Sequence, residues 1–404
     1  MKTISLHAIF KKYSYAHYAS IFSICLLALL IACSFDKPGK INESPYVQIL
    51  FLGHNSEHHH SEKYLPMLAS SLVKRGIHFT YSSNTDDLNE ETLAKYDGLA
   101  LYANHEEISP SQEKALLDYV NSGGGFIPIH CASACFKNSD PFIKMVGGQF
   151  KEHGKATFTA DVLKESESII KDLQEFETWD ETYVHHKINP DIKILMERVE
   201  GDHKEPWTWV NSQGKGRVFY TAYGHDERTW SNPGFHRLME KGILWAIGEK
   251  KGKKVGRLIF PDPVYTEANI PNYEKRYPPL KLQSALSPEE SISLTQIPVG
   301  FELQLFAAEP DIINPISMGW DEKGRLWVIE TVDYPNTVRN EEGIGDDRIK
   351  ICEDTNGDGK ADKFTVFANG LNLPTSLVFA NGGIIVSQAP HFLFLKDTDG
   401  DDKA

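Results

Sequence analysis

Continuous apolar runs in the first half of the chain alternate with stretches of helical periodicity. The apolar run VQILFLG (Val47–Gly53) predicts a fully buried strand, HFTYSS (His78–Ser83) a second strand, and the continuous apolar run DGLALYAN (Asp97–Asn104) a third. Between the first two runs, apolar residues recur at the spacing of one helix face, at Leu65, Leu68, Leu72 and Val73. The pattern is therefore strand, helix, strand from residue 47 onward.

A second helix and a fourth strand follow with clear boundary signals. Ser109 and Gln112 form a capping box with Pro110 at the first helical position, and Gly123 is a natural stop. FIPIH then reads as the fourth strand. Strands at such intervals, with helices between them, predict an α/β domain with a doubly wound, mostly parallel sheet. The later runs KILMERV, PWTWV and GRVFYTAYG and a helix from Asn232-Pro233 to about Gly248 complete it.

The pattern changes in the last third of the chain. Residues 250–295 are rich in lysine and proline and predict a linker. From residue 296 to 404 the chain predicts short strands joined by turns, among them LQLFA, LWVIE and GGIIVS. The predicted organisation is thus an α/β domain at 46–249, a linker and an all-β segment.

An internal repeat marks the all-β segment. IKICEDTNGDGKAD and FLFLKDTDGDDKA align with Asp397 43 residues after Asp354, a period that suits one blade of a β-propeller. Residues 296–404 supply two to three blades, whereas a closed propeller needs at least four. We therefore expect an incomplete propeller that is a fragment or that a partner completes.

The N-terminus predicts a targeting segment. Three lysines, at positions 2, 11 and 12, precede the apolar run Ile21–Ala32, which is short for a bilayer span but typical of a signal peptide. Residues 30–33 resemble a bacterial lipobox, which implies cleavage after residue 32, lipidation of Cys33 and a tether at 33–45. We expect a lipid-anchored protein of the bacterial cell envelope, facing the periplasm or the outer surface. An uncleaved anchor is the alternative.

Charge and cysteine content narrow the function further. The net charge of −14 becomes −17 without residues 1–32, which hold three lysines and no acidic residue, and this disfavours nucleic acid as a partner. After Cys25 and Cys33, the cysteines left are Cys131, Cys135 and Cys352, in a compartment where disulfides persist. The absence of C-x-x-C-H excludes an attached c-type haem.

Histidines follow the strands of the predicted sheet. Ligands bind beyond the carboxyl ends of strands in such sheets, and four strand ends are followed by His54, His105, His130 and His225. Imidazole serves as base, proton shuttle or metal ligand, so a divalent metal is one candidate cofactor. The segment WDETYVHH adds Asp180, which fixes a histidine tautomer or belongs to an ordinary turn. If that segment is extended, Glu181, Tyr183 and His185 share one face.

The stretch GGGFIPIHCASACF (Gly123–Phe136) raises the question of a thiol nucleophile. Cys131 follows a strand, where an elbow can project a nucleophile, but neither His130 nor Cys131 is flanked by the small residues of a G-x-C-x-G elbow. Cys131 and Cys135 either form a disulfide or pack in the core.

Two further groups are candidates for binding. Asp354, Asn356, Asp358 and Asp362 present oxygens like the first half of an EF-hand, but Thr365 stands where the bidentate glutamate belongs. Weak calcium binding and metal-free turns are both open interpretations. Trp230 is a candidate for stacking on a sugar, with burial in the core as the alternative.

Residues 46–249 resemble a ThuA-like (trehalose-utilisation) domain, related in fold to class I glutamine amidotransferases. The resemblance rests on GGGFIPIHCASACF, WDETYVHH, EPWTWV and GKGRVFYTAYGHDERTW. Residues 296–404 resemble the start of a membrane-bound dehydrogenase propeller related to sorbosone and glucose dehydrogenases, which implies a redox partner or a missing propeller portion. By the motif, His130 stands where the amidotransferase cysteine would be.

The resemblance implies a role in sugar catabolism, with a carbohydrate, such as a keto-sugar or a glycoside, as ligand. The motif positions carried over are His130, Asp180, Glu181, His225, Asp226 and Trp230. We expect the first five to be catalytic, with His130 and His225 as base or ligand and Glu181 and Asp226 as acid or orienter. His54, His105, His185, Trp230 and Tyr183 are expected to bind substrate. The alternatives are a non-catalytic sugar-binding module that serves a dehydrogenase and a cysteine-dependent amidohydrolase.

Overall fold

The computed structural model describes residues 45–404, except residues 55, 164–166, 257, 259, 262–263, 268–280 and 334–343. The predicted signal segment 1–32, Cys33 and most of the tether lie outside the described residues. The chain divides into two compact units, one of Met1–His54 and Asn84–Leu258, the other of Asn55–Ser83 and Ile259–Ala404. Within the part of the chain that the structure describes, no helix is long and apolar enough to cross a membrane.

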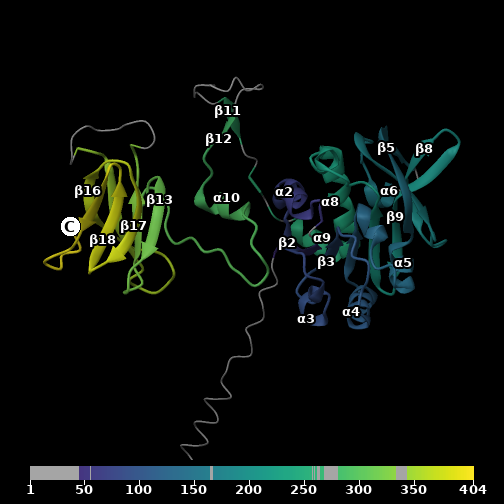
Figure 1. Ribbon diagram of the computed structural model, residues 1–404, viewed down its shortest axis with the longest axis horizontal. Coiled ribbons are helices and arrows are strands. Elements are labelled where there is room, and N and C mark those ends of the chain that lie inside the picture. The colour runs from purple at the N-terminus through teal and green to yellow at the C-terminus, as the bar shows by residue number, and fades with distance from the viewer. Residues whose placement is uncertain are drawn as a thin grey trace, which may run out of the picture. The chain divides into compact units, whose positions relative to one another are not determined.

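The first unit contains a run of parallel strands that ends at the candidate site. β1 (Val47–Leu52), β3 (Gly98–Leu101), β4 (Gly125–Pro128) and β10 (Gly216–Thr221) follow one another, and each neighbouring pair is parallel. Of these strands, β3 is labelled in Figure 1. Their side chains are almost all buried, as the continuous apolar runs predict. A further parallel bridge joins Ile129 to Thr221, directly before His130.

Beyond β10 the same sheet continues with antiparallel strands. β9 (His203–Gln213), β8 (Lys193–Glu200) and β6 (Asp161–Val162) follow in that order. The predicted α/β class is confirmed, with parallel pairing from β1 to β10 and antiparallel pairing from β10 to β6. Trp207 and Trp209 of β9 are fully buried and fill the core at this side.

The helices of the first unit begin where the sequence indicates. α4 (Pro110–Asn121) starts with the predicted capping box, in which Ser109 Oγ accepts from Gln112 N and Gln112 Oε1 accepts from Ser109 N. α8 (Pro233–Ile247) is capped by Asn232 and packs on β10 and β4. The remaining helical segments are η3 (Thr85–Asp87), α3 (Glu90–Leu93), η4 (His130–Ala134), α5 (Asp140–Val146), α6 (Glu167–Ile170), α7 (Glu227–Trp230) and α9 (Glu249–Val255).

The first unit also contains a second, two-stranded antiparallel sheet. It pairs β5 (Gln149–Thr159) with β7 (Glu177–His186), placing His153 opposite Tyr183 and Lys155 opposite Glu181. β7 confirms the expected extended conformation of WDETYVHH. The sequence did not predict β5, because seven of its eleven residues are polar or charged and most of its side chains are exposed.

The second unit begins with elements that the sequence predicts and ends in antiparallel sheets. α2 (Ser61–Leu72) and β2 (Ile77–Ser82) confirm the expected helix and strand, and η2 (Val73–Arg75) joins them. Within the predicted linker, β11 (Tyr265–Glu267) pairs with β12 (Lys281–Gln283), and α10 (Pro288–Ser293) follows.

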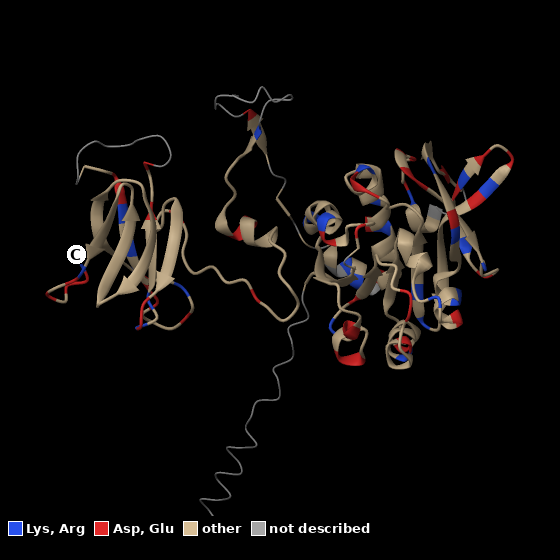
Figure 2. Ribbon diagram, in the orientation of Figure 1, with Lys and Arg blue, Asp and Glu red and all other residues tan. Residues whose placement is uncertain are grey.

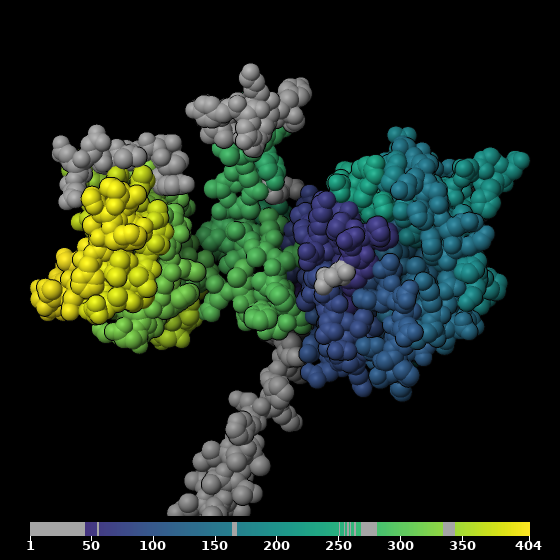
Figure 3. All heavy atoms as spheres, in the orientation of Figure 1, coloured from purple at the N-terminus to yellow at the C-terminus, as the bar shows by residue number. Residues whose placement is uncertain are grey.

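Two antiparallel sheets form the C-terminal part of this unit. One runs β13 (Pro315–Trp320), β14 (Leu326–Glu330), β15 (Asp347–Glu353) and β16 (Lys363–Leu371), and the other β17 (Pro374–Ala380), β18 (Gly383–Gln388) and β19 (His391–Leu395). Trp327, Ile349 and Ile384 belong to one core that joins both sheets, which are in close contact in the space-filling view (Figure 3). The two sheets are consistent with propeller blades.

The strand predicted at LQLFA is wrong. This stretch has no ladder partner; instead the Phe306 carbonyl accepts from Ala361 N and the Gln304 side chain donates to the Asp358 carbonyl. The stretch therefore packs along the turn that follows β15, where its isolated hydrogen bonds replace a sheet.

The sequence repeat corresponds to a structural repeat. The Asp354 carboxylate accepts from the backbone N–H groups of Gly357 (2.7 Å) and Gly359 (2.7 Å). Asp397 accepts from Gly400 (2.7 Å) and Asp402 (3.0 Å), the positions 43 residues later. Each Asp closes the turn after one strand, β15 or β19.

Candidate functional site

The chain turns sharply at His130, where β4 ends and the short helix η4 begins. His130 has a φ of 47°, in the left-handed region that a residue with a Cβ adopts only under constraint. Its Nδ1 lies 2.6 Å from the Ala222 carbonyl oxygen, so Nδ1 carries the proton and donates to that carbonyl. The stretch GGGFIPIHCASACF is thus a strained strand-to-helix elbow with His130 at its apex.

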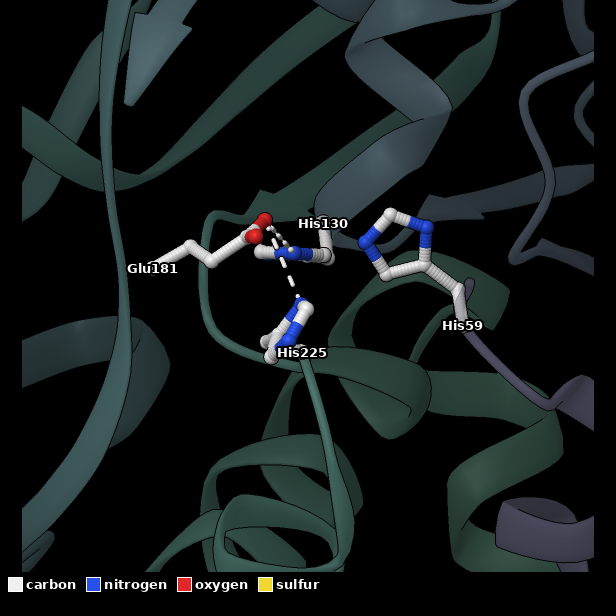
Figure 4. A group of neighbouring side chains, drawn as sticks. All are labelled: His59, His130, Glu181 and His225. Atoms are coloured by element: carbon white, nitrogen blue, oxygen red, sulfur yellow. Dashed lines mark ion pairs between the residues drawn. The ribbon is translucent and has the colours of Figure 1, made fainter. Parts of the chain in front are cut away.

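Three side chains from separate elements meet at this elbow (Figure 4). His130 Nε2 lies 3.4 Å from Glu181 Oε2, and His225 Nδ1 lies 3.3 Å from the same oxygen. Glu181 comes from β7, and His225 follows β10. His130 and Glu181 are buried, whereas the His225 side chain is 20 % exposed. His59, also drawn in Figure 4, belongs to the second compact unit.

The two imidazoles of this cluster have opposite pKa shifts. Burial lowers the pKa of His130, and the Glu181 carboxylate and the Ala222 carbonyl offset this only in part. Burial also acts against the charged form of His225, but Glu181 outweighs it, so the pKa of His225 is raised. One carboxylate therefore faces a histidine that favours the neutral form and one that favours the charged form.

Asp180 holds the backbone of the loop that carries His225. Its carboxylate accepts from Gly224 N (2.8 Å), His225 N (3.1 Å) and Thr229 Oγ1 (2.8 Å). Burial raises the pKa of Asp180 to about 6, although these hydrogen bonds act in the opposite direction. Asp180 belongs to neither a free turn nor a histidine tautomer lock, the two interpretations of the sequence. It holds two main-chain N–H groups and the Thr229 hydroxyl instead.

Asp226 and Trp230 are structural parts of the helix α7. Asp226 caps the helix, accepting from Arg228 N at 3.0 Å, and its carboxylate also pairs with the Arg228 guanidinium. Trp230 is fully buried and donates from Nε1 to the Gly224 carbonyl at 2.8 Å. The expected sugar-stacking role of Trp230 is therefore wrong, because solvent reaches neither face of its ring.

The four strand-end histidines form two pairs. The rings of His130 and His225 are 6.0 Å apart, and those of His54 and His105 are 6.1 Å apart. His105 Nε2 also lies 3.3 Å from the Gly53 carbonyl, and its ring stacks on Phe136. Glu181 contacts both His130 and His225, so these two histidines are the stronger candidates for catalysis or metal binding.

Tyr183 and His185 share a face with Glu181, as predicted, but they support the elbow rather than line an open site. The Tyr183 ring stacks on His130 at 4.1 Å. His185 lies between Glu205 Oε1 (Nδ1, 3.0 Å) and the Tyr220 hydroxyl (Nε2, 2.9 Å). That hydroxyl is also 3.1 Å from the His130 carbonyl. Both side chains are buried, and their role in substrate binding stays a prediction.

The thiols do not form a nucleophilic site. Cys131 and Cys135 are free and buried, so the disulfide interpretation is wrong. Burial raises the pKa of Cys131 well above that of an ordinary thiol, whereas a nucleophilic cysteine needs a lowered pKa. Cys135 donates to the Ala103 carbonyl. This geometry argues against the cysteine-dependent amidohydrolase.

Two residues at the edge of the cluster were missed from the sequence. His153 of β5 places Nδ1 3.4 Å from Glu181 Oε1, and its side chain is 35 % exposed. Trp179 of β7 has its ring 5.6 Å from that of His225, with the Arg228 guanidinium 3.4 Å over its face. The Trp-Asp-Glu order in WDETYVHH placed Trp179 two residues before Glu181, a signal that points to the same face.

The acidic turns of the second unit are closed by their own backbone. Asp354 accepts from the backbone N–H groups of its turn, and Asp362 accepts from Thr355. Asn356 and Asp358 likewise accept from Asp358 N and Lys360 N. In the repeat, carboxylate oxygens of Asp397, Asp399 and Asp401 lie within 4.8 Å of one another. Calcium binding at these turns stays a prediction.

Known families match each of the two regions. Residues 48–246 match the family model ThuA, described as trehalose utilisation, and residues 287–404 match a domain of unknown function, DUF7133. No curated protein matches the chain.

Similar solved structures include two ThuA-like proteins and a sugar hydrolase. The protein from Bacteroides uniformis ATCC 8492 is 18 % identical, covers 52 % of this chain and 94 % of its own, and has a TM-score of 0.42. The protein from Parabacteroides merdae ATCC 43184 is 16 % identical, covers 50 % and 90 %, and has a TM-score of 0.43. A β-galactosidase from Rahnella sp. R3 is 14 % identical, covers 48 % and 31 %, and has a TM-score of 0.37.

Proposed function

We propose that the ThuA-like domain of residues 48–246 processes a carbohydrate in sugar catabolism at the cluster of His130, Glu181 and His225. The observation that carries the proposal is the shared carboxylate. Glu181 faces two imidazoles whose pKa values are shifted apart, the arrangement by which one site supplies both an acid and a base. In this proposal His130 and His225 act as base or ligand, and Glu181 acts as acid or orienter.

The substrate class follows from the family description and from the edge of the cluster. Trp179, half-buried beside His225, presents an aromatic ring of the kind that packs on the C–H face of a sugar. His153 adds a partly exposed imidazole next to Glu181. A glycoside or an oxidised (keto) sugar is the proposed substrate, because both react by proton transfer at oxygen or at carbon next to a carbonyl.

The test compares sugar turnover in variants of the full chain. Release of glucose from trehalose and solvent deuterium exchange into a keto-sugar are measured for the wild type, Glu181→Gln and His225→Gln. We expect at least a hundredfold loss in both variants. His186→Gln, on the same strand β7 but exposed, is the control. Equal rates in all four proteins would refute the proposed roles.

A sugar-binding module without turnover is the second candidate. Trp179 favours it, because an aromatic platform contributes to affinity whether or not chemistry follows. This function predicts saturable binding of trehalose by calorimetry, weakened by Trp179→Ala, with no product formed. Product formation by the wild type excludes it.

The second unit and the chain's location complete the proposal. We propose that the sheets β13–β16 and β17–β19 are blades of a propeller, of the dehydrogenase type that the sequence of residues 296–404 resembles. The sequence of residues 21–33 supports a lipid-anchored envelope protein. Metabolic labelling with a radioactive fatty acid tests the anchor: Cys33→Ala should abolish the label.

A further inference from the structure

His130, Glu181 and His225 bring three potential ligand atoms close together. Each offers a nitrogen or oxygen within 4.8 Å of the others, and the two separations from Glu181 Oε2 are 3.4 and 3.3 Å. Figure 4 shows the carboxylate directed between the two imidazoles. The set comes from three segments that are distant in sequence, so the fold itself assembles it.

The tautomer of His130 determines what faces Glu181. Because Nδ1 donates its proton to the Ala222 carbonyl, a neutral His130 ring has a lone pair on Nε2. That lone pair is directed at a carboxylate oxygen 3.4 Å away. Two acceptors this close repel each other unless a positive charge lies between them. A proton or a cation between the two atoms removes this repulsion.

The separations favour a metal cation over a shared proton. A hydrogen bond between nitrogen and a carboxylate is usually 2.7–3.0 Å long, about 0.5 Å shorter than either separation here. Tetrahedral ligands about 2.0–2.1 Å from zinc lie about 3.3 Å from each other. The observed 3.3 and 3.4 Å match this edge length.

The surroundings resemble the outer shell of a metal site. A histidine that binds a metal almost always donates its other N–H to a carbonyl or carboxylate, as His130 does to Ala222. Asp180 holds Gly224 N and His225 N, which fixes the position of the third ligand. Tyr183 stacks on the His130 ring and so restrains the orientation of this ligand.

We propose that His130 Nε2, Glu181 Oε2 and His225 Nδ1 bind a divalent transition-metal ion, with zinc as the leading candidate. Two histidines and one glutamate are the ligand set of several catalytic zinc sites, in which the fourth position takes water or substrate. This inference rests on the cluster of the proposed function and selects the ligand role for both histidines. The ion would polarise a sugar hydroxyl or carbonyl at the remaining position.

The test measures metal binding in the full chain without any sugar. The protein is stripped with a chelator and titrated with Zn²⁺, and separately with Co²⁺, whose visible absorption reports nitrogen and oxygen ligands. Millimolar Mg²⁺ and Ca²⁺ are included to compete with Zn²⁺ for all-oxygen groups such as Asp397, Asp399 and Asp401. We expect one equivalent of Zn²⁺ bound, a Co²⁺ spectrum, and a higher Tm with metal.

Substitutions of the proposed ligands test whether these side chains bind the metal. Glu181→Gln and His225→Gln should each bind Zn²⁺ at least tenfold more weakly and lose the Co²⁺ spectrum. His186→Gln should bind like the wild type, since its side chain is exposed on the same strand. If Glu181→Gln does not fold, the variant of the partly exposed His225 still gives the answer. Wild-type binding below a tenth of an equivalent, or unchanged affinity in His225→Gln, would overturn the proposal.

The outcome is separable from that of the proposed function. Zinc binding without sugar turnover would keep the metal site and reject the carbohydrate reaction. Turnover that persists in the chelated, zinc-free chain would keep the reaction and reject a catalytic role for the metal, while the Zn²⁺ titration still decides whether the site binds it.

Discussion

Gly224 sets how closely the end of β10 approaches His130. Its φ is 137°, and a Cβ at this position would lie 3.2 Å from His130 Cβ and 3.3 Å from Ile129 Cγ2. We expect Gly224→Ala to destabilise the chain by about 2–3 kcal/mol, from backbone strain plus crowding, and to weaken metal binding.

Gly201 provides the matched control for this substitution. It also has a positive φ, of 60°, but a Cβ there would meet nothing within 4 Å. Gly201→Ala should therefore cost about 1 kcal/mol and leave the site intact. Chemical denaturation and Zn²⁺ titration of both variants give the comparison; equal effects of the two would mean that crowding at His130 is unimportant.

The reactivity of Cys131 tests whether the thiols are core residues. Cys131 is 1 % exposed, and burial raises its pKa, so at neutral pH it is a protonated, enclosed thiol. We expect iodoacetamide to leave Cys131 unmodified in the folded chain and to alkylate it after unfolding in guanidinium, as peptide mass spectrometry will show. Cys131→Ala should keep sugar turnover. Rapid labelling of the native chain together with inactivation would restore the amidohydrolase.

His78 gives the chain a specific sensitivity to acid. Burial lowers its pKa to about 4, whereas the unfolded side chain has a pKa of about 6.5. Between these values the unfolded state binds more protons, so stability from this residue is complete above pH 6.5 and is lost as the pH falls toward 4. We expect the free energy of unfolding to drop by about 1–2 kcal/mol between pH 7 and pH 5 on this account.

A variant without the titrating group isolates this effect. His78→Gln should show a shallower decline over the same pH range in urea denaturation, while exposed His391→Gln should follow the wild type. A His78→Gln curve parallel to that of the wild type would assign the acid sensitivity to other groups.

At the scale of elements, α4 shows how local signals specify a boundary. In the capping box, the side chains of Ser109 and Gln112 each accept a hydrogen bond from the other residue's backbone N–H. Ser109→Ala should cost about 1 kcal/mol, because Gln112 N loses its acceptor at the helix start. Thermal unfolding measures it, with Ser70→Ala inside α2 as control, since that hydroxyl only bonds the Met67 carbonyl of its own helix. An unchanged Tm for Ser109→Ala would contradict the capping argument.

Some secondary-structure elements are predictable from the sequence and others are not. Parallel strands and capped helices are specified by neighbouring residues, so β1, β3, β4 and α4 were predictable. β5 was not, because its exposed polar side chains carry no apolar signal and its partner β7 is distant in sequence. The strand predicted at LQLFA failed for the converse reason: Phe306 and Ala307 pack on the core cluster of β14 and β15 without forming a ladder.

In the candidate site too, features set by neighbouring residues were predictable and features set by tertiary packing were not. The elbow at His130 and the shared face of Glu181, Tyr183 and His185 follow from local pattern and strand alternation. The exposure of each side chain depends on what packs over it, so the buried states of Trp230, His185 and Cys131 appeared only in the structure. His153 escaped notice for the same reason as β5.

At the scale of the whole molecule, charge and repetition are the dominant features. Acidic and basic residues are mixed over the first unit in Figure 2, and the net charge is −14, in keeping with a small-molecule ligand rather than nucleic acid. The second unit repeats a strand and an acidic turn after 43 residues, with the same carboxylate-to-backbone bonds in both copies.

Because the two turns are equivalent, the same substitution should have the same effect in both. Asp354 and Asp397 each accept backbone N–H groups at equivalent positions, and these bonds lower the pKa of both carboxyl groups. Because an amide oxygen is a weaker acceptor than a carboxylate, Asp354→Asn and Asp397→Asn should both lower the Tm of the second unit, even in buffer with EDTA. Exposed Asp399→Asn is the control. If either substitution lowers the Tm only when calcium is present, a bound cation, and not the backbone, holds that turn closed.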